Sequence, residues 1–286
     1  MNSSSTDLLR RDAAGIAHIV PLSGGHDSTC LAFRLREEEP RPYNYVMTPT
    51  GNELPELFEF VRWLGTDNAL GHRVIPIMEG RGLLDYSRYQ KMIPNFHKRH
   101  CTRGLKIWPL ARWMAERAED GPIVLYIGLR ADEPAREGAL YPSLPNVSQR
   151  FPLREWGMDD PDVLAWLEQR NILSLMPERT DCALCFHQQI GEWWRLWHEF
   201  PDLFAEGVAF EEEMGGSFRT PKMKDGEPVY STRYGHTFLA CARDTWPCRL
   251  TDLGIVFANG HVPTVGRDPR VRDLFRSSGA CRACTL

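Results

Sequence analysis

Short apolar runs that end at polar or glycine-containing turns predict the strands of this chain. The runs cover residues 16–22, 43–48, 73–78 and 123–129. The last run is the most continuous, as expected for a strand that is covered on both faces. Between the runs, apolar side chains recur with the spacing of a helix. We therefore expect helices over residues 28–35, 53–64, 106–118 and 161–169.

Strands that alternate with helices predict an α/β protein with a Rossmann-like parallel sheet and right-handed crossovers. Residues 1–12 are polar and are expected to be flexible, whereas residues 13–205 are expected to form the α/β domain. This domain includes a Cys-rich segment at 180–205. Residues 206–286 are expected to form a C-terminal extension with a cysteine-containing tail. Beyond about residue 149 the chain becomes rich in Trp, Pro, Cys and charged residues, and we expect this part to be mostly helical.

One expected helix, over residues 190–198, carries three tryptophans, Trp193, Trp194 and Trp197. Aromatic side chains of this size bury a large apolar area when they pack in a core. We therefore interpret the cluster as core packing rather than as a binding surface.

The composition is that of a soluble globular protein, with 42% hydrophobic and 25% charged residues in a chain of 286. No run of about 18 apolar residues occurs, so no membrane span is expected. The polar N-terminus lacks the apolar core of a signal peptide, which favours a cytoplasmic location. The formal net charge of −4 argues against a protein that coats nucleic acid through bulk charge, but residues 97–103 and the tail 261–286 are locally basic.

The turn after the first expected strand is the most informative motif. It reads Ser23-Gly24-Gly25-His26-Asp27-Ser28 and leads directly into a helix. Two successive glycines let the backbone approach a ligand closely, and the unpaired N–H groups of a helix N-terminus bind anions. Ser23 and Ser28 add hydroxyl donors, and Asp27 suits a Mg²⁺ ion that phosphates carry. The alternative is a capped turn without a ligand, but the complete string directly after a strand favours nucleotide phosphates.

This string resembles the PP-loop of the ATP pyrophosphatases, in the adenine nucleotide alpha-hydrolase-like superfamily, whose Rossmann-like sheet is of the HUP type. Further segments resemble one branch, the phosphoadenosine phosphosulfate reductase family in the broad sense. They read TGNELPE at 50–56, CTRGLK at 101–106, GLRADE at 128–133 with Arg136, FPLREW at 151–156, and DV at 162–163. The matches keep the family order over roughly residues 16–205, and the layout is most similar to that of the DNA phosphorothioation ATP pyrophosphatases.

The resemblance implies an enzyme that binds ATP with Mg²⁺, adenylates an acceptor with release of pyrophosphate, and supports sulfur transfer. The reductases proper act through a C-terminal Glu-Cys-Gly cysteine, whereas the tail here carries Cys281 and Cys284 without that sequence. The intact loop fits cleavage of ATP to AMP and pyrophosphate better than reduction of a sulfonucleotide. The basic segments favour nucleic acid as the acceptor, and the sulfur would come from a donor protein such as a cysteine desulfurase.

The same resemblance implies the residues of the site. The loop residues from Ser23 to Ser28 would bind the phosphates, and Asp27, Ser28 and Arg130 would be catalytic. Gly128 and Arg130 follow the fourth strand and would face the crevice where ligands of open parallel sheets bind. His26 occupies the variable position of the loop, where an acid near neutral pH and a solvent-facing side chain both fit.

Five charged residues have two interpretations each. Arg130 and Arg136 suit phosphate or sulfate oxygens, or else ion pairs with Asp132, Glu133 or Glu137. Glu53 and Glu56 follow the second strand, where each would bind a ribose or cap the next helix. Lys106 would contact phosphate or, as a lone helical lysine, would face solvent.

The cysteines suggest a metal. Cys182 and Cys185 form a CxxC pair with the spacing of two ligands on one metal, and the basic surroundings of Cys101 favour its thiolate. Three thiolates suit a [4Fe–4S] cluster with one open iron, and thiolation relatives resemble this arrangement. A Zn²⁺ site with a fourth ligand from His100, His187 or the tail, and a site without metal, stay open.

Two other functions also stay open. A thiol-dependent phosphoadenylyl-sulfate reductase would attack sulfur through Cys281 or Cys284. A non-catalytic, ATP-sensing subunit of a complex would bind the nucleotide without releasing pyrophosphate.

Overall fold

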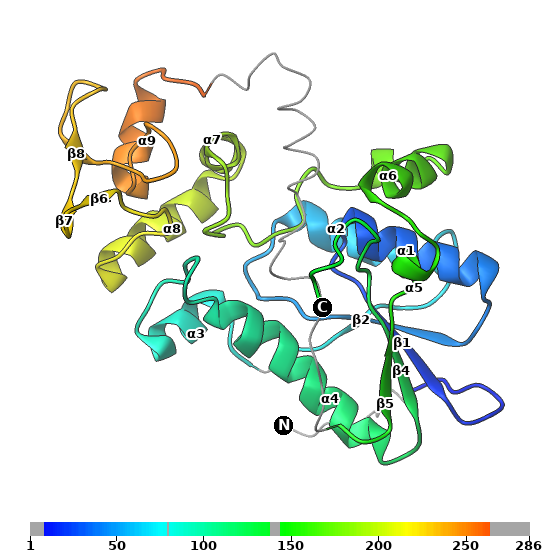
Figure 1. The fold of residues 1–286 in the computed structure, drawn as a ribbon. Helices are drawn as coiled ribbons and strands as arrows, with labels where there is room; N and C mark the ends of the chain where they lie inside the picture. Colours follow the sequence, from blue (N-terminus) through cyan, green and yellow to red (C-terminus); the bar gives the residue numbers. More distant parts are fainter. Residues whose placement is uncertain (1–8, 79, 138–143, 264–286) are drawn as a thin grey trace.

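A parallel five-stranded sheet forms the centre of the molecule (Figure 1). The computed structural model describes residues 9–78, 80–137 and 144–263. The strand order is β3-β2-β1-β4-β5, with β1 (Ala17–Pro21), β2 (Tyr43–Met47), β3 (Ile75–Pro76), β4 (Ile123–Tyr126) and β5 (Val147–Arg150). The α/β, Rossmann-like prediction is confirmed.

The two edge strands differ from the expectation. The run at 73–78 contributes only the two residues of β3 to the sheet. The other edge strand, β5, was missed, because its sequence Val-Ser-Gln-Arg contains no apolar run. Both have a single neighbour in the sheet, and edge strands are commonly short or polar because they face solvent on one side.

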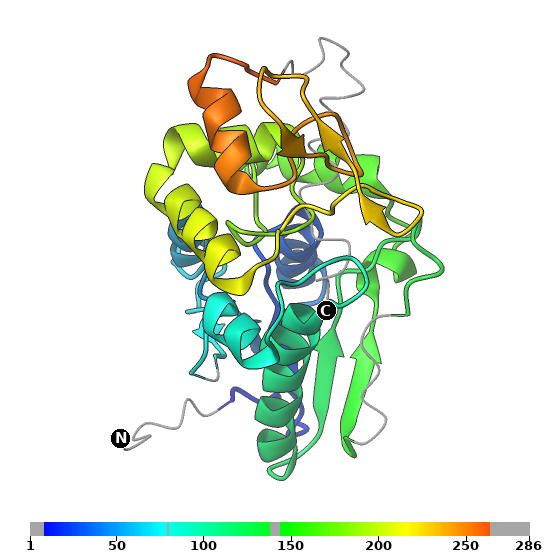
Figure 2. The same ribbon diagram turned by 90° about the vertical axis from the view of Figure 1, so that its left-hand side faces the viewer.

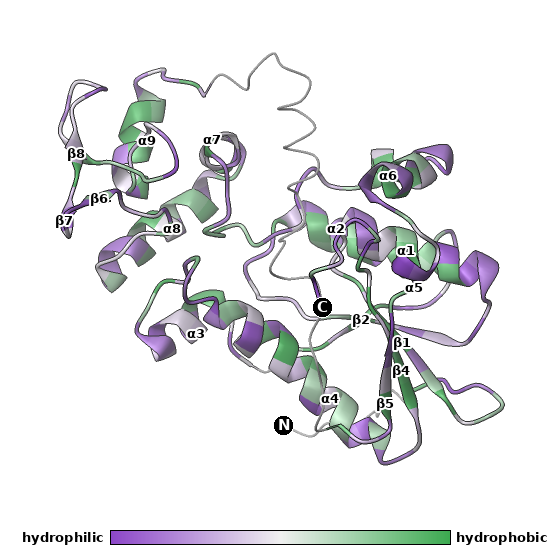
Figure 3. Ribbon diagram, viewed as in Figure 1, coloured by the Kyte–Doolittle hydropathy of each residue, from purple (hydrophilic) through white to green (hydrophobic). Residues whose placement is uncertain are grey.

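Helices cover both faces of the sheet. On one face lie α1 (His26–Glu38), α2 (Pro55–Leu64), α5 (Pro152–Glu155) and α6 (Asp160–Gln169), which share one buried core with the strands. On the other face, α4 (Trp108–Ala118) buries Leu110 and Met114 against Ile19 and Ile123. The central strands are mainly hydrophobic, whereas the helices also carry hydrophilic residues (Figure 3), as expected for strands covered on both sides.

The helix expected over 106–118 begins earlier and with a different geometry. A π-helical turn, η1 (Thr102–Ile107), precedes α4. Within it, a Cβ on Gly104 would lie 2.2 Å from the ring of Tyr86 on the preceding helix, α3 (Leu83–Gln90), so a larger residue here would require that ring to move. Such turns recur at functional sites, and this one carries Lys106.

The C-terminal part is mostly helical and adjoins the sheet domain (Figure 2). It contains η2 (Leu173–Leu175), α7 (Ile190–Glu199), α8 (Pro201–Met214), α9 (Leu250–Ala258) and two short hairpins, β6 (Met223–Lys224) with β7 (Glu227–Pro228) and β8 (Tyr230–Ser231) with β9 (Phe238–Leu239). Trp193 is fully buried in a core shared by α7, α8 and α9, and Trp194 and Trp197 pack against it, which confirms core packing for this cluster. The expected domain boundary at residue 205 falls inside α8.

Residues 9–12 belong to the segment that was expected to be flexible, but they are fixed to the sheet domain. The Arg11 guanidinium donates to the carbonyls of Gly15 and Arg117 at 2.8 Å, and Asp12 accepts from the N–H of Ile16. Among the described residues, none of the helices is both long and apolar enough to cross a membrane. Cys281 and Cys284 lie outside the described residues.

Candidate functional site

The candidate site lies where the strand order reverses. β1 pairs with β2 on one side and with β4 on the other, so the chain leaves these neighbouring strands in opposite directions at their carboxyl ends. Ligands of open α/β sheets bind at such a switch point. Here a cavity that opens to solvent lies between the loop after β1 and residue Gly128 after β4.

The structure brings most of the predicted nucleotide-binding residues to this cavity. From the glycine loop, Ser23, Gly25, Asp27 and Ser28 line it. From other elements it is lined by Glu53, Lys106 and Gly128. Gly24, His26, Arg130 and Arg136 are not among the lining residues.

Sequence reasoning missed two hydroxyl residues of the cavity, Thr48 and Thr180. Thr48 directly follows β2, so its place at the carboxyl end of a strand was a usable signal. Thr180 comes from the segment between α6 and α7, far along the chain, and no local sequence pattern predicts its place in the cavity.

Hydrogen bonds among the loop's own residues fix its shape. The Ser28 hydroxyl donates to the Gly25 carbonyl at 3.1 Å and accepts from the Ser23 N–H at 3.2 Å. The two serine hydroxyls lie 3.1 Å apart. Gly25 is the extended residue before α1, and no side chain caps that helix. The first N–H groups of α1 therefore lie beside the cavity without a side-chain cap, as an anion site requires.

Gly24 shows why glycine occupies the loop. Its φ of +78° is a left-handed conformation that other residues rarely adopt. A Cβ there would also lie 2.4 Å from Cδ1 of Leu57 on α2. The residue thus lets the loop pack directly on α2, although it does not line the cavity.

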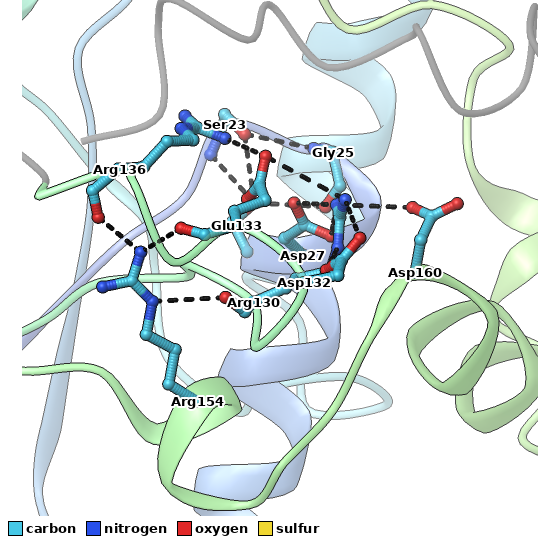
Figure 4. A network of polar contacts seen from close by, with 10 residues as sticks. Ser23, Gly25, Asp27, Arg130, Asp132, Glu133, Arg136, Arg154 and Asp160 are labelled. Carbon is cyan, nitrogen blue, oxygen red and sulfur yellow. Dashed lines mark hydrogen bonds and ion pairs between the residues drawn. The ribbon is translucent and has the colours of Figure 1, made fainter.

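Arg130 lies behind the loop and has four carboxylates within 4.0 Å, those of Asp27, Asp132, Glu133 and Asp160 (Figure 4). Its Nη1 donates to both carboxylate oxygens of Asp27, at 3.0 and 2.9 Å, and lies 3.3 Å from Asp160. Its Nε donates to Asp132 at 2.9 Å. Burial raises the pKa of Asp27 to about 6, and the Arg130 guanidinium opposes this rise. The ion-pair interpretation of Arg130 is thus realised, with Asp27 as an additional partner that the sequence did not suggest.

Arg136 forms the expected ion pair with Glu133, at 2.5 Å. The segment that carries both residues is held by Arg154, which donates to the backbone carbonyls of Arg130, Glu133 and Arg136 (Figure 4). These contacts connect the loop after β4 to α5, so that Arg130 is positioned by backbone contacts as well as by charge.

Neither glutamate of the TGNELPE segment caps α2. Glu53 lines the cavity and turns back on its own loop, where it accepts from the N–H groups of Thr50 and Gly51 at 2.6 and 2.9 Å. Glu56 pairs with Arg195 of α7 at 2.7 Å. The helix-cap interpretation is therefore wrong, because α2 has no side-chain cap. Glu53 is the one of the pair that faces the cavity.

A second, small cavity adjoins the first, and its lining includes Cys101, Cys182 and Cys185. Lys106 lines both cavities. Thr50 connects them as well, since its hydroxyl contacts the Cys182 sulfur at 3.1 Å and donates to Glu53 at 2.6 Å. The three cysteines singled out in the sequence thus share one cavity next to the glycine loop.

The thiols do not form a metal-ligand set as they lie. Within the described ranges, no group of three His, Cys, Asp or Glu side chains is arranged to hold a metal ion. Burial and the nearby arginines lower the pKa of His187 to about 4, and the His100 ring lies 3.3 Å from the Ser87 hydroxyl. The arrangement therefore does not support the cluster or the Zn²⁺ site.

Comparison with known proteins adds little about function. No family model matches the chain. It is 24% identical over 234 residues to an uncharacterized nin region protein, ORF290, of Escherichia phage lambda, which covers 72% of this chain and 79% of that protein. A phosphoadenylyl-sulfate reductase from Candida auris, solved as a phosphate complex, aligns with a TM-score of 0.37 and 12% identity over 56% of this chain and 73% of that chain. The class of protein is therefore defined by the fold itself: an open α/β protein of the Rossmann-like type with a cavity at its switch point.

Proposed function

We propose that the chain binds Mg·ATP in the cavity at the switch point and transfers the adenylyl group to an oxygen of an acceptor, with release of pyrophosphate. The observation that carries this proposal is the convergence of Ser23, Ser28, Lys106 and the uncapped N-terminus of α1 on one cavity beside Asp27. Hydroxyls, N–H groups and a lysine are the donors that phosphate oxygens require.

The residues have distinct roles in this proposal. The loop and Lys106 bind the phosphates and neutralise charge that develops on the leaving pyrophosphate. Asp27 suits Mg²⁺, which is commonly held by one or two carboxylates together with substrate phosphates. The ion would supply further charge neutralisation at the phosphates. Arg130 neutralises Asp27 while no cation is bound, and it is released from this carboxylate when Asp27 binds the ion.

The adenylated acceptor then receives sulfur from the thiol cavity. A persulfide on one cavity cysteine, loaded by a donor protein such as a cysteine desulfurase, attacks the activated carbon, and the C–O bond to AMP breaks. A second cavity thiolate attacks the resulting disulfide and releases the thiolated product, which leaves a protein disulfide for an external thiol to reduce. Lys106, which lines both cavities, supports this assignment of two successive steps to adjacent sites.

Metal analysis of anaerobically purified protein separates the thiol route from the cluster that the sequence suggests. Brown protein with stoichiometric iron would assign the three thiols to a [4Fe–4S] cluster instead. Colourless protein with stoichiometric zinc would reject the cluster, and protein with neither metal would support the persulfide route.

Pyrophosphate release from Mg·ATP tests the proposed function, with the nucleotide that co-purifies identified by mass spectrometry. Asp27→Asn should abolish release. Asp202→Asn is a matched control, because Asp202 also lies in the first turn of a helix but on α8, away from the cavity. Full activity of Asp27→Asn would overturn the loop assignment. If the protein binds ATP but releases no pyrophosphate with any acceptor tested, the result would favour a nucleotide-sensing subunit.

A further inference from the structure

The charge of this chain is concentrated in one segment. Residues 81–112 contain eight Lys and Arg residues and one acidic residue, Asp85, in a chain whose formal net charge is −4. Within this segment, residues 91–103 contain no Asp or Glu at all. We call residues 91–103 the basic loop. This local surplus of positive charge does not follow from the overall composition.

The basic loop has an inner and an outer side. On the inner side, Pro94 and Cys101 line the thiol cavity. On the outer side, Lys98, Arg99 and Arg103 are exposed. The loop is thus the outer wall of the cavity in which the proposed sulfur transfer takes place.

Exposed aromatic rings accompany these charges. Phe96, in the basic loop, is 38% exposed, and its ring packs edge-on against Phe186, which lines the thiol cavity. Tyr89 and Trp108, on the helices that flank the loop, are 64% and 52% exposed. Cations near flat rings on one surface are the combination that binds single-stranded nucleic acid, because phosphates pair with the cations and unstacked bases stack on the rings.

Positive charge also reaches the cavity wall from other elements. Burial lowers the pKa of His187, and Arg243, Arg99 and Arg179 lower it further. The guanidinium of Arg243 lies over the Phe96 ring, 5.2 Å from its centre. Arg179 is buried and paired with Glu192 and Asp181, so a polyanion on the basic loop would meet favourable charge from two segments, through Arg99 and Arg243.

We propose that the basic loop and its flanking aromatic rings bind a single-stranded nucleic acid and present one of its nucleotides to the thiol cavity. This inference rests on the proposed function for the identity of the acceptor, but the binding surface itself is independent of ATP. Exposed bases are needed because the thiol cavity lies behind the loop, where a base inside a duplex does not reach.

Binding is measured without ATP, by fluorescence anisotropy of a short labelled DNA or RNA single strand, so that a failure of pyrophosphate release leaves the result valid. At low salt, Lys98→Gln/Arg99→Gln should weaken binding about tenfold or more, and it should reduce the slope of log affinity against log salt by about 1.4, since each phosphate contact on a single strand contributes about 0.7. Phe96→Ala should weaken binding roughly tenfold with little change in the salt slope.

Arg41→Gln/Arg62→Gln is the matched control, because it removes the same charge from exposed positions outside the basic loop, just before β2 and in the last turn of α2. A similar loss of affinity in this control would overturn the proposal, as would no measurable binding to either single strand. Binding of the corresponding duplex with equal affinity would overturn the role of the exposed rings. Binding to phosphatidylserine vesicles but not to the oligonucleotides would assign the surface to a membrane. Thermal unfolding of each variant shows whether it is folded.

Discussion

Arg130 and Asp27 lie 103 residues apart in the sequence, and Nη1 of the arginine donates to both carboxylate oxygens of the aspartate, at 3.0 and 2.9 Å. The side chain of Asp27 is only 6% exposed and that of Arg130 13%. The contact joins the glycine loop after β1 to the segment after β4, so it crosses the switch point of the sheet. The charge of the loop carboxylate therefore depends on a residue from the neighbouring strand.

Loss of Arg130 should lower the free energy of unfolding, because Asp27 then lacks its partner. Arg130→Ala removes the group that opposes the rise of the Asp27 pKa, so at neutral pH the folded protein must bury an unpaired carboxylate or take up a proton there. Removal of one member of a buried pair destabilises a protein by about 3 kcal/mol. Urea unfolding at neutral pH measures the effect. Addition of Asp27→Asn removes the unpaired charge and should recover part of the stability. Equal stability of the single and the double variant would show that the pair is not coupled.

The pH dependence of Mg·ATP binding should reflect the protonation of Asp27. Burial raises its pKa to about 6, and only the carboxylate binds a cation. Affinity should therefore fall about tenfold per pH unit below about 6 and be constant above it. The contribution of Asp27 to stability has the opposite trend: the folded state favours the protonated acid, so this contribution is lost as the pH rises from the ordinary value of 3.8 through about 6.

Calorimetric titrations at several pH values test the first of these trends, with Asp27→Asn as the reference. The variant should bind weakly and show no dependence near pH 6. The same pH profile in the wild type and in the variant would assign the titration to another group.

Two glycine variants separate backbone strain from packing. Gly24→Ala places a side chain at φ +78° and also brings its Cβ into contact with Leu57. Gly71→Ala places a side chain at a similar φ of +73°, but its Cβ has no neighbouring atom within 4 Å. We expect Gly71→Ala to cost about 1 kcal/mol and Gly24→Ala to cost clearly more. Urea unfolding measures both, and similar costs would mean that the loop moves away from α2 freely.

The cysteines should differ in their reaction with iodoacetamide. Cys101 is partly exposed, whereas Cys30, Cys182, Cys185, Cys241 and Cys248 are buried. Burial raises the pKa of Cys30 and of Cys248 to about 12, which leaves almost no thiolate at pH 8. Alkylation mapped by mass spectrometry should therefore modify Cys101 first. Modification of Cys30 or Cys248 at the same rate would contradict this arrangement.

Glu211 should make the stability of the C-terminal part depend on pH. It is 1% exposed and accepts from the N–H groups of Phe218 and Leu250, both at 2.8 Å. Burial nevertheless raises its pKa to about 7 from an ordinary 4.5, so the folded state favours the acid form. Its stabilising contribution, roughly 3 kcal/mol at most, is present below pH 4.5 and is lost as the pH rises through about 7.

Unfolding of Glu211→Gln across this range should lack that part of the pH dependence. Glu212→Gln, at the exposed neighbouring position, should retain it. An unchanged profile in Glu211→Gln would show that other groups titrate in this range.

The central strands, the helices α1, α2 and α4 and the glycine loop were predictable from the sequence alone, because each depends on spacing and residue type within a short window, whereas α3 was missed. β2 and β4 follow from runs of apolar residues, and Ser23 to Ser28 follow from their position between an apolar strand and a helix. The same local reasoning missed β5, whose residues become a strand only through hydrogen bonds with β4.

Which side chains meet became known from the folded structure. Arg130 was expected at the crevice, but its contact with Asp27 required the pairing of β1 with β4. Thr180 enters the nucleotide cavity, and Lys106 lines both cavities, because segments far apart in the chain fold against the carboxyl ends of the strands. Local sequence fixes which conformations a segment favours, whereas the contacts between distant segments depend on how the whole chain buries its apolar surface.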